Sequence, residues 1–240
     1  MRRRLVSLLS IAFIAGALGC SQHARYVPKT VVVFIDISGS VKDFGVYREA
    51  WPKIVAHLHG GDRVVLAAIS GQTYTRYRPL IDAEVPTYSP LRENTLMHEQ
   101  ALRQLDGEFS AALEKILTEP RSPRTDIMNS LVLAEKIFKG DPGRRHILVL
   151  LSDMLEDSDE YRFEQLHLTE SMTLQVIERK RQQRELPDLE QAAVYVGGAS
   201  AQSPEKAREV ERFWREYVTA ANGHLLSDRY APTLIQFKEQ

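Results

Sequence analysis

Short runs of β-branched and other apolar residues alternate with longer helical patterns along most of this 240-residue chain. This alternation is typical of a mostly parallel sheet that is covered by helices on both faces. The sequence therefore predicts a three-layer α/β fold with one antiparallel edge strand. Once an N-terminal signal is removed, about 220 residues remain, which is enough for one large domain with a buried core.

The order of the predicted elements follows from these runs and patterns. The turn Ser70-Gly71-Gln72 indicates a hairpin, so the strand after it is expected to be the antiparallel edge. Pro52 is expected to mark a kink or the first turn of a new helix. The predicted strands are Val31–Ile35, Arg63–Ile69, Thr73–Ile81, Arg145–Ser152, Ala192–Val196 and His224–Ser227, and the predicted helices are Phe44–Leu58, Asn94–Leu117, the apolar stripe from Ile127 to Phe138, Glu164–Arg184 and Pro204–Ala221.

One turn after the first predicted strand carries a carboxylate and two hydroxyl groups. Asp36, Ser38 and Ser40 stand there in the sequence Asp-Ile-Ser-Gly-Ser. Mg²⁺ takes six oxygen ligands in octahedral array, so these three side chains supply half of a metal site. The same residues could instead cap the turn by bonding backbone groups. Gly39 is expected to give the turn backbone angles that are costly for other residues and to keep bulk away from an ion.

Two distant residues are candidates for the other half of the site. Thr125 lies in a loop at the entrance of the predicted helix that carries the apolar stripe, and Asp153 closes a predicted strand. Ligand sites in open α/β sheets lie outside the carboxyl ends of the strands, which is where Asp36 and Asp153 both fall. We therefore expect the fold to bring both halves of the site together.

This ordered set of residues resembles the metal-ion-dependent adhesion site of von Willebrand factor A domains, and we expect residues 29–235 to form such a domain. The family's residue types occupy all five positions. The resemblance implies a divalent cation, Mg²⁺ in the first place, with Mn²⁺ or Ca²⁺ as alternatives. Asp126 is expected to serve the helix N-terminus electrostatically, with an outer-sphere metal contact as the alternative. The implied metal-binding residues are Asp36, Ser38, Ser40, Thr125 and Asp153.

The resemblance also implies a function for the chain. In the family, the hydroxyl groups bind the cation with help from the aspartates, and this mostly neutral set of ligands leaves the metal short of negative charge. A Glu or Asp side chain of a partner protein then completes the coordination. Thr125 and Asp153 are the pair expected to shift on binding. We therefore expect a protein-binding module and not an enzyme.

Two other functions are compatible with the same residues. A metal-dependent hydrolase could use the ion to polarise a phosphate or to activate water, although no independent general base stands out in the sequence. A structural lipoprotein could retain the residues as turn chemistry while another surface binds. Loss of Asp36, Thr125 or Asp153 should abolish partner binding in the first case, turnover in the second, and neither in the third.

Two other groups of residues are poor candidates for metal sites. Asp157-Ser158-Asp159 is not a calcium loop, because Tyr161 and Arg162 occupy positions that need an oxygen ligand and a glycine. We expect the acidic stretch from Asp153 to Glu160 to be a solvated loop at the rim of the metal site. His57 and His59 would point to different faces of a helix and are expected to lie at a solvated helix end.

The N-terminal segment predicts export and lipid attachment. Three arginines precede an apolar stretch, and residues 1–19 have the basic and apolar regions of a secretory signal. The segment ends in Ala17-Leu18-Gly19-Cys20, which resembles the bacterial lipoprotein cleavage box. Cys20 is the only cysteine in the chain, so it has no internal disulfide partner and is expected to carry the lipid. An uncleaved anchor with an incidental cysteine is the alternative.

The expected location is the bacterial cell envelope. Residues 20–28 would form a lipidated tether that reaches roughly 30 Å, so the domain would stay close to its membrane. Ser21 favours the periplasmic face of the outer membrane if the source is Gram-negative. Without residues 1–19 the chain has 28 basic and 32 acidic residues, a net charge near −4, which does not suggest a nucleic-acid partner.

Overall fold

A single six-stranded sheet organises the protein, whose structure is a computed structural model that describes residues 26–41, 43–75, 77–87, 95–234 and 237. The predicted signal and Cys20 lie outside these residues. The strand order is β3-β2-β1-β4-β5-β6, and only β3 at one edge is antiparallel. The fold class predicted from the sequence is confirmed. The strands are β1 (Lys29–Asp36), β2 (Arg63–Ile69), β3 (Ile81–Glu84), β4 (Arg145–Leu151), β5 (Ala193–Gly197) and β6 (Tyr230–Ala231).

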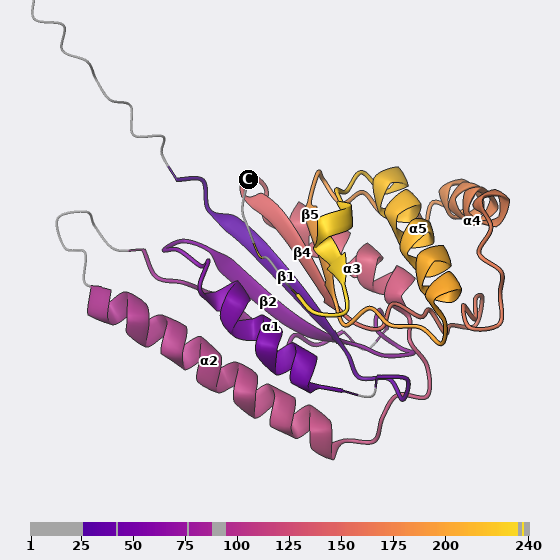
Figure 1. The fold of residues 1–240 in the computed structure, drawn as a ribbon. Coiled ribbons are helices and arrows are strands. Elements are labelled where there is room, and N and C mark those ends of the chain that lie inside the picture. The colour runs from indigo at the N-terminus through magenta and orange to yellow at the C-terminus, as the bar shows by residue number, and fades with distance from the viewer. Residues whose placement is uncertain (1–25, 42, 76, 88–94, 235–236, 238–240) are drawn as a thin grey trace, which may run out of the picture.

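Helices cover both faces of the sheet (Figure 1). Helices α1 and α2 pack on one face, whereas α3 and α5 pack on the other, with α4 beside α5. None of the helices among the described residues is long and apolar enough to cross a bilayer. The helices are α1 (Gly45–Val55), α2 (Thr95–Thr118), α3 (Ile127–Lys139), α4 (Glu170–Gln182) and α5 (Pro204–Ala220), and the short 3-10 helix η2 (Ser227–Arg229) precedes β6.

The alternation of side chains along β1 divides the core between the two faces. Val31, Val33 and Ile35 point to the α1 and α2 side, whereas Val32 and Phe34 point to the side of α3 and α5. All five side chains are fully buried. This burial explains why the strand is an uninterrupted apolar run, since a central parallel strand is covered on both sides.

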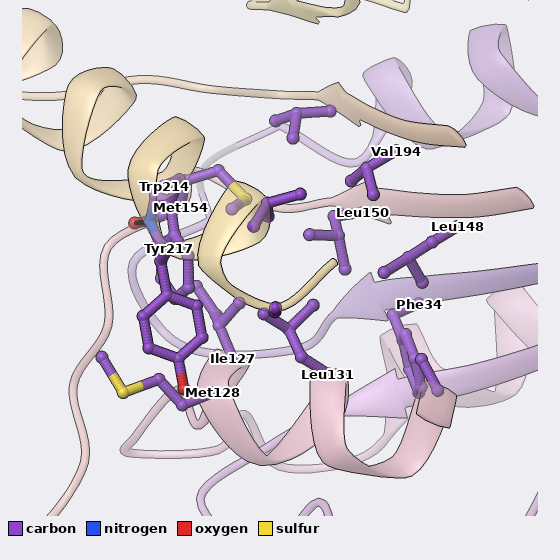
Figure 2. Packing of buried hydrophobic residues seen from close by; sticks show 14 of the residues in the cluster. Phe34, Ile127, Met128, Leu131, Leu148, Leu150, Met154, Val194, Trp214 and Tyr217 are labelled. Carbon is purple, nitrogen blue, oxygen red and sulfur yellow. Dashed lines mark hydrogen bonds between the residues drawn. The ribbon is translucent and has the colours of Figure 1, made fainter. Parts of the chain in front are cut away.

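Two aromatic residues of α5 link the core to the loop that follows β4 (Figure 2). Trp214 and Tyr217 are fully buried against α3 and the sheet. The indole Nε1 of Trp214 donates a hydrogen bond of 2.8 Å to the carbonyl of Met154. Met154 has a φ of +67°, which is uncommon for a residue other than glycine and is held by its surroundings. The α5 helix therefore fixes the backbone next to Asp153.

The edge strand β3 does not lie where the sequence predicted it. Thr73–Ile81 was expected to be a strand, but it begins with a turn in which the Thr73 hydroxyl donates to the carbonyl of Ser70 at 2.7 Å. Pairing with β2 begins only at Ile81. The predicted antiparallel edge is therefore confirmed, and its position is wrong because Thr73 bonds locally instead of joining the ladder.

Three other boundaries also differ from the prediction. Helix α4 begins at Glu170 and not at Glu164, because the side chain of Thr169 accepts a hydrogen bond from Met172 N and caps the helix there. The last strand is β6, since His224 forms only an isolated bridge. Helix α1 runs through Pro52, so the proline does not start a new helix, and the expected kink stays a prediction.

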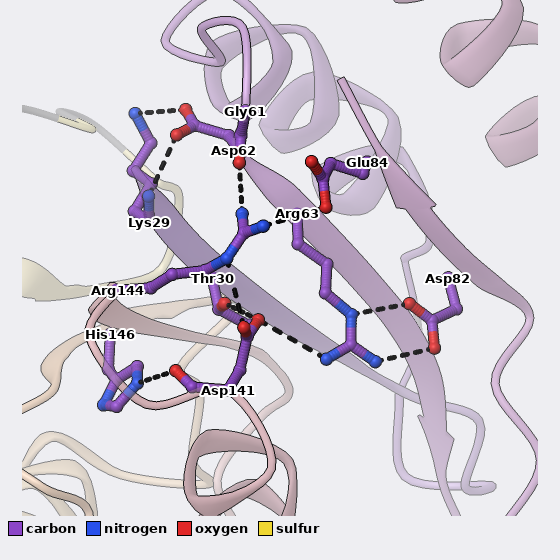
Figure 3. Close-up of polar contacts among 10 residues, drawn as sticks. All are labelled: Lys29, Thr30, Gly61, Asp62, Arg63, Asp82, Glu84, Asp141, Arg144 and His146. Carbon is purple, nitrogen blue, oxygen red and sulfur yellow. Dashed lines mark hydrogen bonds and ion pairs between the residues drawn. The ribbon is translucent and has the colours of Figure 1, made fainter. Parts of the chain in front are cut away.

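A polar network fixes the edge of the sheet where the chain enters β1 (Figure 3). The side chains of Lys29 and Asp62 are fully buried and form an ion pair at 3.0 Å. Asp62 also accepts hydrogen bonds from Lys29 N, from His59 N and from the hydroxyl of Tyr26. Nearby, Arg144 donates to the carbonyl of Gly61 and pairs with Glu84 and Asp141.

Candidate metal centre

The carboxyl edge of the sheet gathers the candidate ligands from three loops. Asp36 ends β1, and Asp153 follows β4, the parallel neighbour of β1. Thr125 lies in the loop before α3, and Ser38 pairs with Ser122 of that loop in an isolated bridge. The five predicted ligands are thus neighbours in space although they are distant in sequence.

Asp36 is buried at the centre of the three loops. One of its carboxylate oxygens accepts a hydrogen bond of 2.8 Å from Ser38 N, and the other accepts one of 2.7 Å from the hydroxyl of Ser152. Burial and the nearby negative charge of Asp153 raise the pKa of Asp36 to about 6, although these hydrogen bonds oppose the rise. Asp36 and Asp153 therefore form a buried acidic pair.

The hydroxyl groups of the first loop face this acidic pair. Ser38 Oγ and Ser40 Oγ are 2.8 Å apart. Burial raises the pKa of Asp153, and a hydrogen bond from Ser40 acts against that rise. Gly39 does not have a positive φ, and a Cβ there would lie 3.9 Å from its nearest contact, the carbonyl oxygen of Ser122. The conformational reason expected for Gly39 is therefore wrong.

The loop of Thr125 is joined to the loop of Asp153 by backbone hydrogen bonds. Thr125 N donates to the Asp157 carbonyl at 3.0 Å, and Asp157 N donates back at 2.9 Å. Asp126 caps α3, because its carboxylate accepts hydrogen bonds from Asn129 N and from the Asn129 side-chain amide. This capping fits the expected role of Asp126 at the helix N-terminus, and the outer-sphere contact stays a prediction.

Glu156 is a functional candidate that the sequence interpretation missed. The acidic stretch was expected to be solvated, but Met154, Leu155 and Glu156 are buried and only the part from Asp157 onward is accessible. Glu156 Oε2 accepts hydrogen bonds from Ile127 N and Met128 N at 2.8 and 3.2 Å. Its Oε1 has no hydrogen-bond partner among the described residues. Met154 and Leu155, the two apolar residues directly before Glu156, were the feature of the sequence that indicated burial of this part of the loop.

We expect Glu156 to make the stability of the protein fall as the pH rises from about 6 to 8. Burial, and next the charge of Asp126, raise the pKa of Glu156 from 4.5 to about 8. The folded state therefore binds more protons than the unfolded state between these two values, and the stability decreases with pH across that window. Glu156→Gln keeps an acceptor for Ile127 N and has no charge. Above pH 8 its free energy of unfolding should therefore be higher than that of the wild type by on the order of a few kcal/mol.

Urea unfolding of both proteins at several pH values, with a chelator present, measures this difference. Asp36 contributes its own dependence up to about pH 6, so the comparison is read above that value. Equal slopes for the wild type and Glu156→Gln between pH 6 and 8 would mean that Glu156 is ionised in the folded protein.

A cavity of about 230 Å³ opens among the three loops. Its lining combines hydroxyl groups with charged side chains of the rim. Arg162 carries a half-exposed side chain there, and its Nε lies 3.7 Å from a carboxylate oxygen of Asp157. The lining residues that bear on the site are Ser38, Ser40, Thr125, Glu156, Asp157, Arg162 and Glu164.

The residues at this edge suit a hard divalent cation. Two carboxylates and three hydroxyl groups offer only oxygen donors, which Mg²⁺, Mn²⁺ and Ca²⁺ prefer. A bound cation would neutralise the acidic pair Asp36 and Asp153, whose burial is otherwise unfavourable. The described part of the chain contains no cluster of three or more His, Cys, Asp or Glu side chains that could hold a metal ion.

The two histidines considered in the sequence lie at the opposite edge of the sheet. His59 stacks on Tyr26 with ring centroids 5.0 Å apart, and the His57 carbonyl accepts a hydrogen bond from Lys29 Nζ. The Nδ1 atom of each ring lies within hydrogen-bond distance of a backbone carbonyl. Both histidines therefore belong to the polar network at the chain entrance.

Comparisons with known proteins give matches only to solved structures. No protein-family model and no curated protein matches the sequence. The manganese-loaded TRAP protein of Plasmodium vivax matches with a TM-score of 0.43 and 12% identity, over 85% of this chain and 68% of that chain. An aerotolerance-related membrane protein from Bacteroides fragilis matches with a TM-score of 0.38 and 13% identity, over 81% of this chain and 89% of its own. A von Willebrand factor type A protein from Catenulispora acidiphila matches with a TM-score of 0.36 and 16% identity, over 81% of this chain and 43% of that chain.

Proposed function

We propose that this protein is a divalent-metal-dependent protein-binding module that a lipid holds at a bacterial membrane. The observation that carries the proposal is that Ser38, Ser40 and Thr125 line one small cavity, while the interacting carboxylates Asp36 and Asp153 lie next to these serines. Bound Mg²⁺ would be held by Asp36, Ser38, Ser40, Thr125 and Asp153. It would supply an electrophilic centre for a carboxylate of the partner.

The charge of this ligand set supports an acidic partner group. By the resemblance, neutral hydroxyl groups bind the cation with only help from the aspartates, so the metal keeps part of its positive charge for an anionic ligand. Two arginines add positive charge near the opening: Arg162 lines the cavity, and Arg121 donates to the carbonyl groups of Ser38 and Val41. A glutamate or aspartate side chain would therefore meet the metal with Arg162 and Arg121 close by, beside the acidic rim residues Asp157 and Glu164.

The resemblance to von Willebrand factor A domains, which rests on the same five residues, favours binding over catalysis. The hydrolase alternative requires a base near the ion. Among the described residues that line the cavity, Glu156 is the only buried acid. Its Oε2 already accepts hydrogen bonds from Ile127 N and Met128 N at the N-terminus of α3. Assay of the purified protein with p-nitrophenyl phosphate and Mg²⁺ tests this directly, and metal-dependent turnover lost in Asp153→Ala would replace the binding proposal.

The binding proposal is tested with a short acidic peptide as the probe. A glutamate-containing peptide and its glutamine counterpart are titrated into ¹⁵N-labelled protein, with saturating Mg²⁺ or with EDTA. We expect resonances of the three metal-site loops to shift only for the acidic peptide and only with Mg²⁺, because the carboxylate and the ion bind cooperatively. Equal shifts with EDTA, or with the glutamine peptide, would contradict the proposal.

The membrane part of the proposal depends on Cys20 and is tested in bacterial cells. A lipid on Cys20 would place the protein in the membrane fraction, on the periplasmic side of the outer membrane in a Gram-negative host. Cys20→Ser removes the only thiol in the chain. We expect this variant to leave the membrane fraction, and its retention there would favour an uncleaved N-terminal anchor.

A further inference from the structure

A second polar cavity lies at the amino ends of the parallel strands, on the side of the sheet opposite the metal loops. It has a volume of about 500 Å³ and lies beside the first residues of β4 and β5. Seven residues separate it from the metal end along β4, which corresponds to roughly 20 Å. The charged residues and histidines that line it are Arg144, Arg145, His146, Glu190, His224 and Arg229. Three arginines therefore face one acidic residue.

Arg229 is the residue that points to a ligand. It ends the 3-10 helix η2 and is only 9% exposed. Its guanidinium lies over the ring of Tyr195, 4.7 Å from the centroid. Among the described residues, no carboxylate lies within ion-pair distance of this guanidinium and no hydrogen-bond acceptor contacts it. A buried cation without a counter-ion is unfavourable, and a bound anion would remove that cost.

The other charged residues near this cavity already have partners. Arg144 contacts the Gly61 carbonyl and the carboxylates of Glu84 and Asp141 (Figure 3). The acid of the lining, Glu190, has its carboxylate 3.5 Å from His146 Nδ1. These carboxylates therefore have partners other than Arg229, whose planar, five-donor group can take an incoming ligand.

We propose that this cavity binds a phosphate group, with Arg229 as its main ligand. Guanidinium groups pair with phosphate through two parallel hydrogen bonds, and an aromatic ring behind the guanidinium fixes its plane. Free phosphate and the phosphodiester of an anionic lipid headgroup both offer this chemistry. The chain enters the domain next to the cavity, because Arg145 N donates a hydrogen bond of 2.9 Å to the carbonyl of Pro28. If the proposed lipid anchor holds, this edge faces the headgroups.

Calorimetric titration with two soluble probes separates these sources. The probes are inorganic phosphate and dihexanoyl phosphatidylglycerol below its critical micelle concentration, at constant ionic strength and with EDTA so that no metal can bridge. We expect Arg229→Met to lose roughly tenfold or more in affinity, because it keeps the packing on Tyr195 but removes the guanidinium. Arg208→Met removes the same charge from the exposed side of α5 and should bind like the wild type. Asp153→Ala should also bind normally, so failure of the metal site would not affect this result.

Each outcome decides the proposal. Binding of both probes that is lost in Arg229→Met establishes a general phosphate site, and binding of the lipid probe alone identifies the headgroup as the source. Absence of binding at millimolar concentrations of both probes would overturn the proposal. Binding that is equal in wild type, Arg229→Met and Arg208→Met would also overturn it. Circular dichroism of Arg229→Met verifies that the variant is folded.

Discussion

Asp153→Ala is expected to weaken Mg²⁺ binding by more than roughly a hundredfold, since even residues behind a metal's direct ligands change its affinity by 10- to 100-fold. Asp153 is one of two carboxylates at the site, and without it the hydroxyl groups of Ser38, Ser40 and Thr125 must bind the ion with Asp36 alone. Its removal also relieves the repulsion that, after burial, raises the pKa of Asp36. The variant should therefore remain folded while it loses the metal.

The matched control for this change is Asp159→Ala. Asp159 lies in the same acidic stretch, its side chain is 95% exposed, and it pairs with Arg124. It removes the same charge near the site without removing a candidate ligand. Calorimetric titration of Mg²⁺ and Mn²⁺ should show one site in the wild type and in Asp159→Ala, and none in Asp153→Ala. Equal affinities for all three proteins would exclude Asp153 as a ligand.

The same titration has an expected pH dependence. A proton competes with the metal for Asp36, whose pKa is raised to about 6. Mg²⁺ affinity should therefore rise with pH between 5 and 7, and protons should be released on binding at the lower values. A metal affinity that is independent of pH across this range would show that Asp36 does not take part.

Asp62→Ala is expected to destabilise the protein by about 3–5 kcal/mol, the usual cost of removing one partner of a buried ion pair. Lys29, whose side chain is fully buried, would lose its ion-pair partner. Lys29 N, His59 N and the hydroxyl of Tyr26 would lose their acceptor as well. Urea unfolding measures the change in the free energy of unfolding.

A double variant separates the loss of the charge partner from the loss of packing. Lys29→Met with Asp62→Leu replaces both charges by apolar side chains, and this should cost much less than Asp62→Ala alone. If the double variant is as unstable as the single one, the network acts through its hydrogen bonds to the backbone and not through charge balance. A loss of less than 1 kcal/mol in Asp62→Ala would show that water reaches Lys29.

The central sheet could be predicted from the sequence because burial on both faces leaves a plain signal. Val31–Ile35 is apolar at every position, and the structure confirms it as part of a central strand. The peripheral strands left no such signal. β6 contains only Tyr230 and Ala231, which are half-buried, and it pairs with β5 over two residues. A strand this short depends on its neighbour and cannot be recognised from periodicity.

The candidate site was predictable in part for the same kind of reason. Asp36 and Asp153 directly follow buried strands, so topology alone places them at one edge. The role of Glu156 was hidden because its partners are the backbone N–H groups of Ile127 and Met128, far away in sequence. Every residue except proline has a backbone N–H group, so the residue types do not reveal which of these groups a side chain will bind. Contacts of this kind become visible only when the loops are placed in space.

The double hydrogen bond between Thr125 and Asp157 has a mechanical consequence for a protein that responds to a ligand. Glu156 also accepts hydrogen bonds from the first turn of α3. These contacts together join the loop of Thr125 and the loop of Asp153 so that the two are expected to move as one unit. Thr125 and Asp153 therefore cannot readily approach or leave an ion independently of each other. Any displacement of one carries the other and α3 with it. A force on the metal would thus reach the buried face of the sheet through α3, and the bridge between Ser38 and Ser122 would pass it to the serine loop as well.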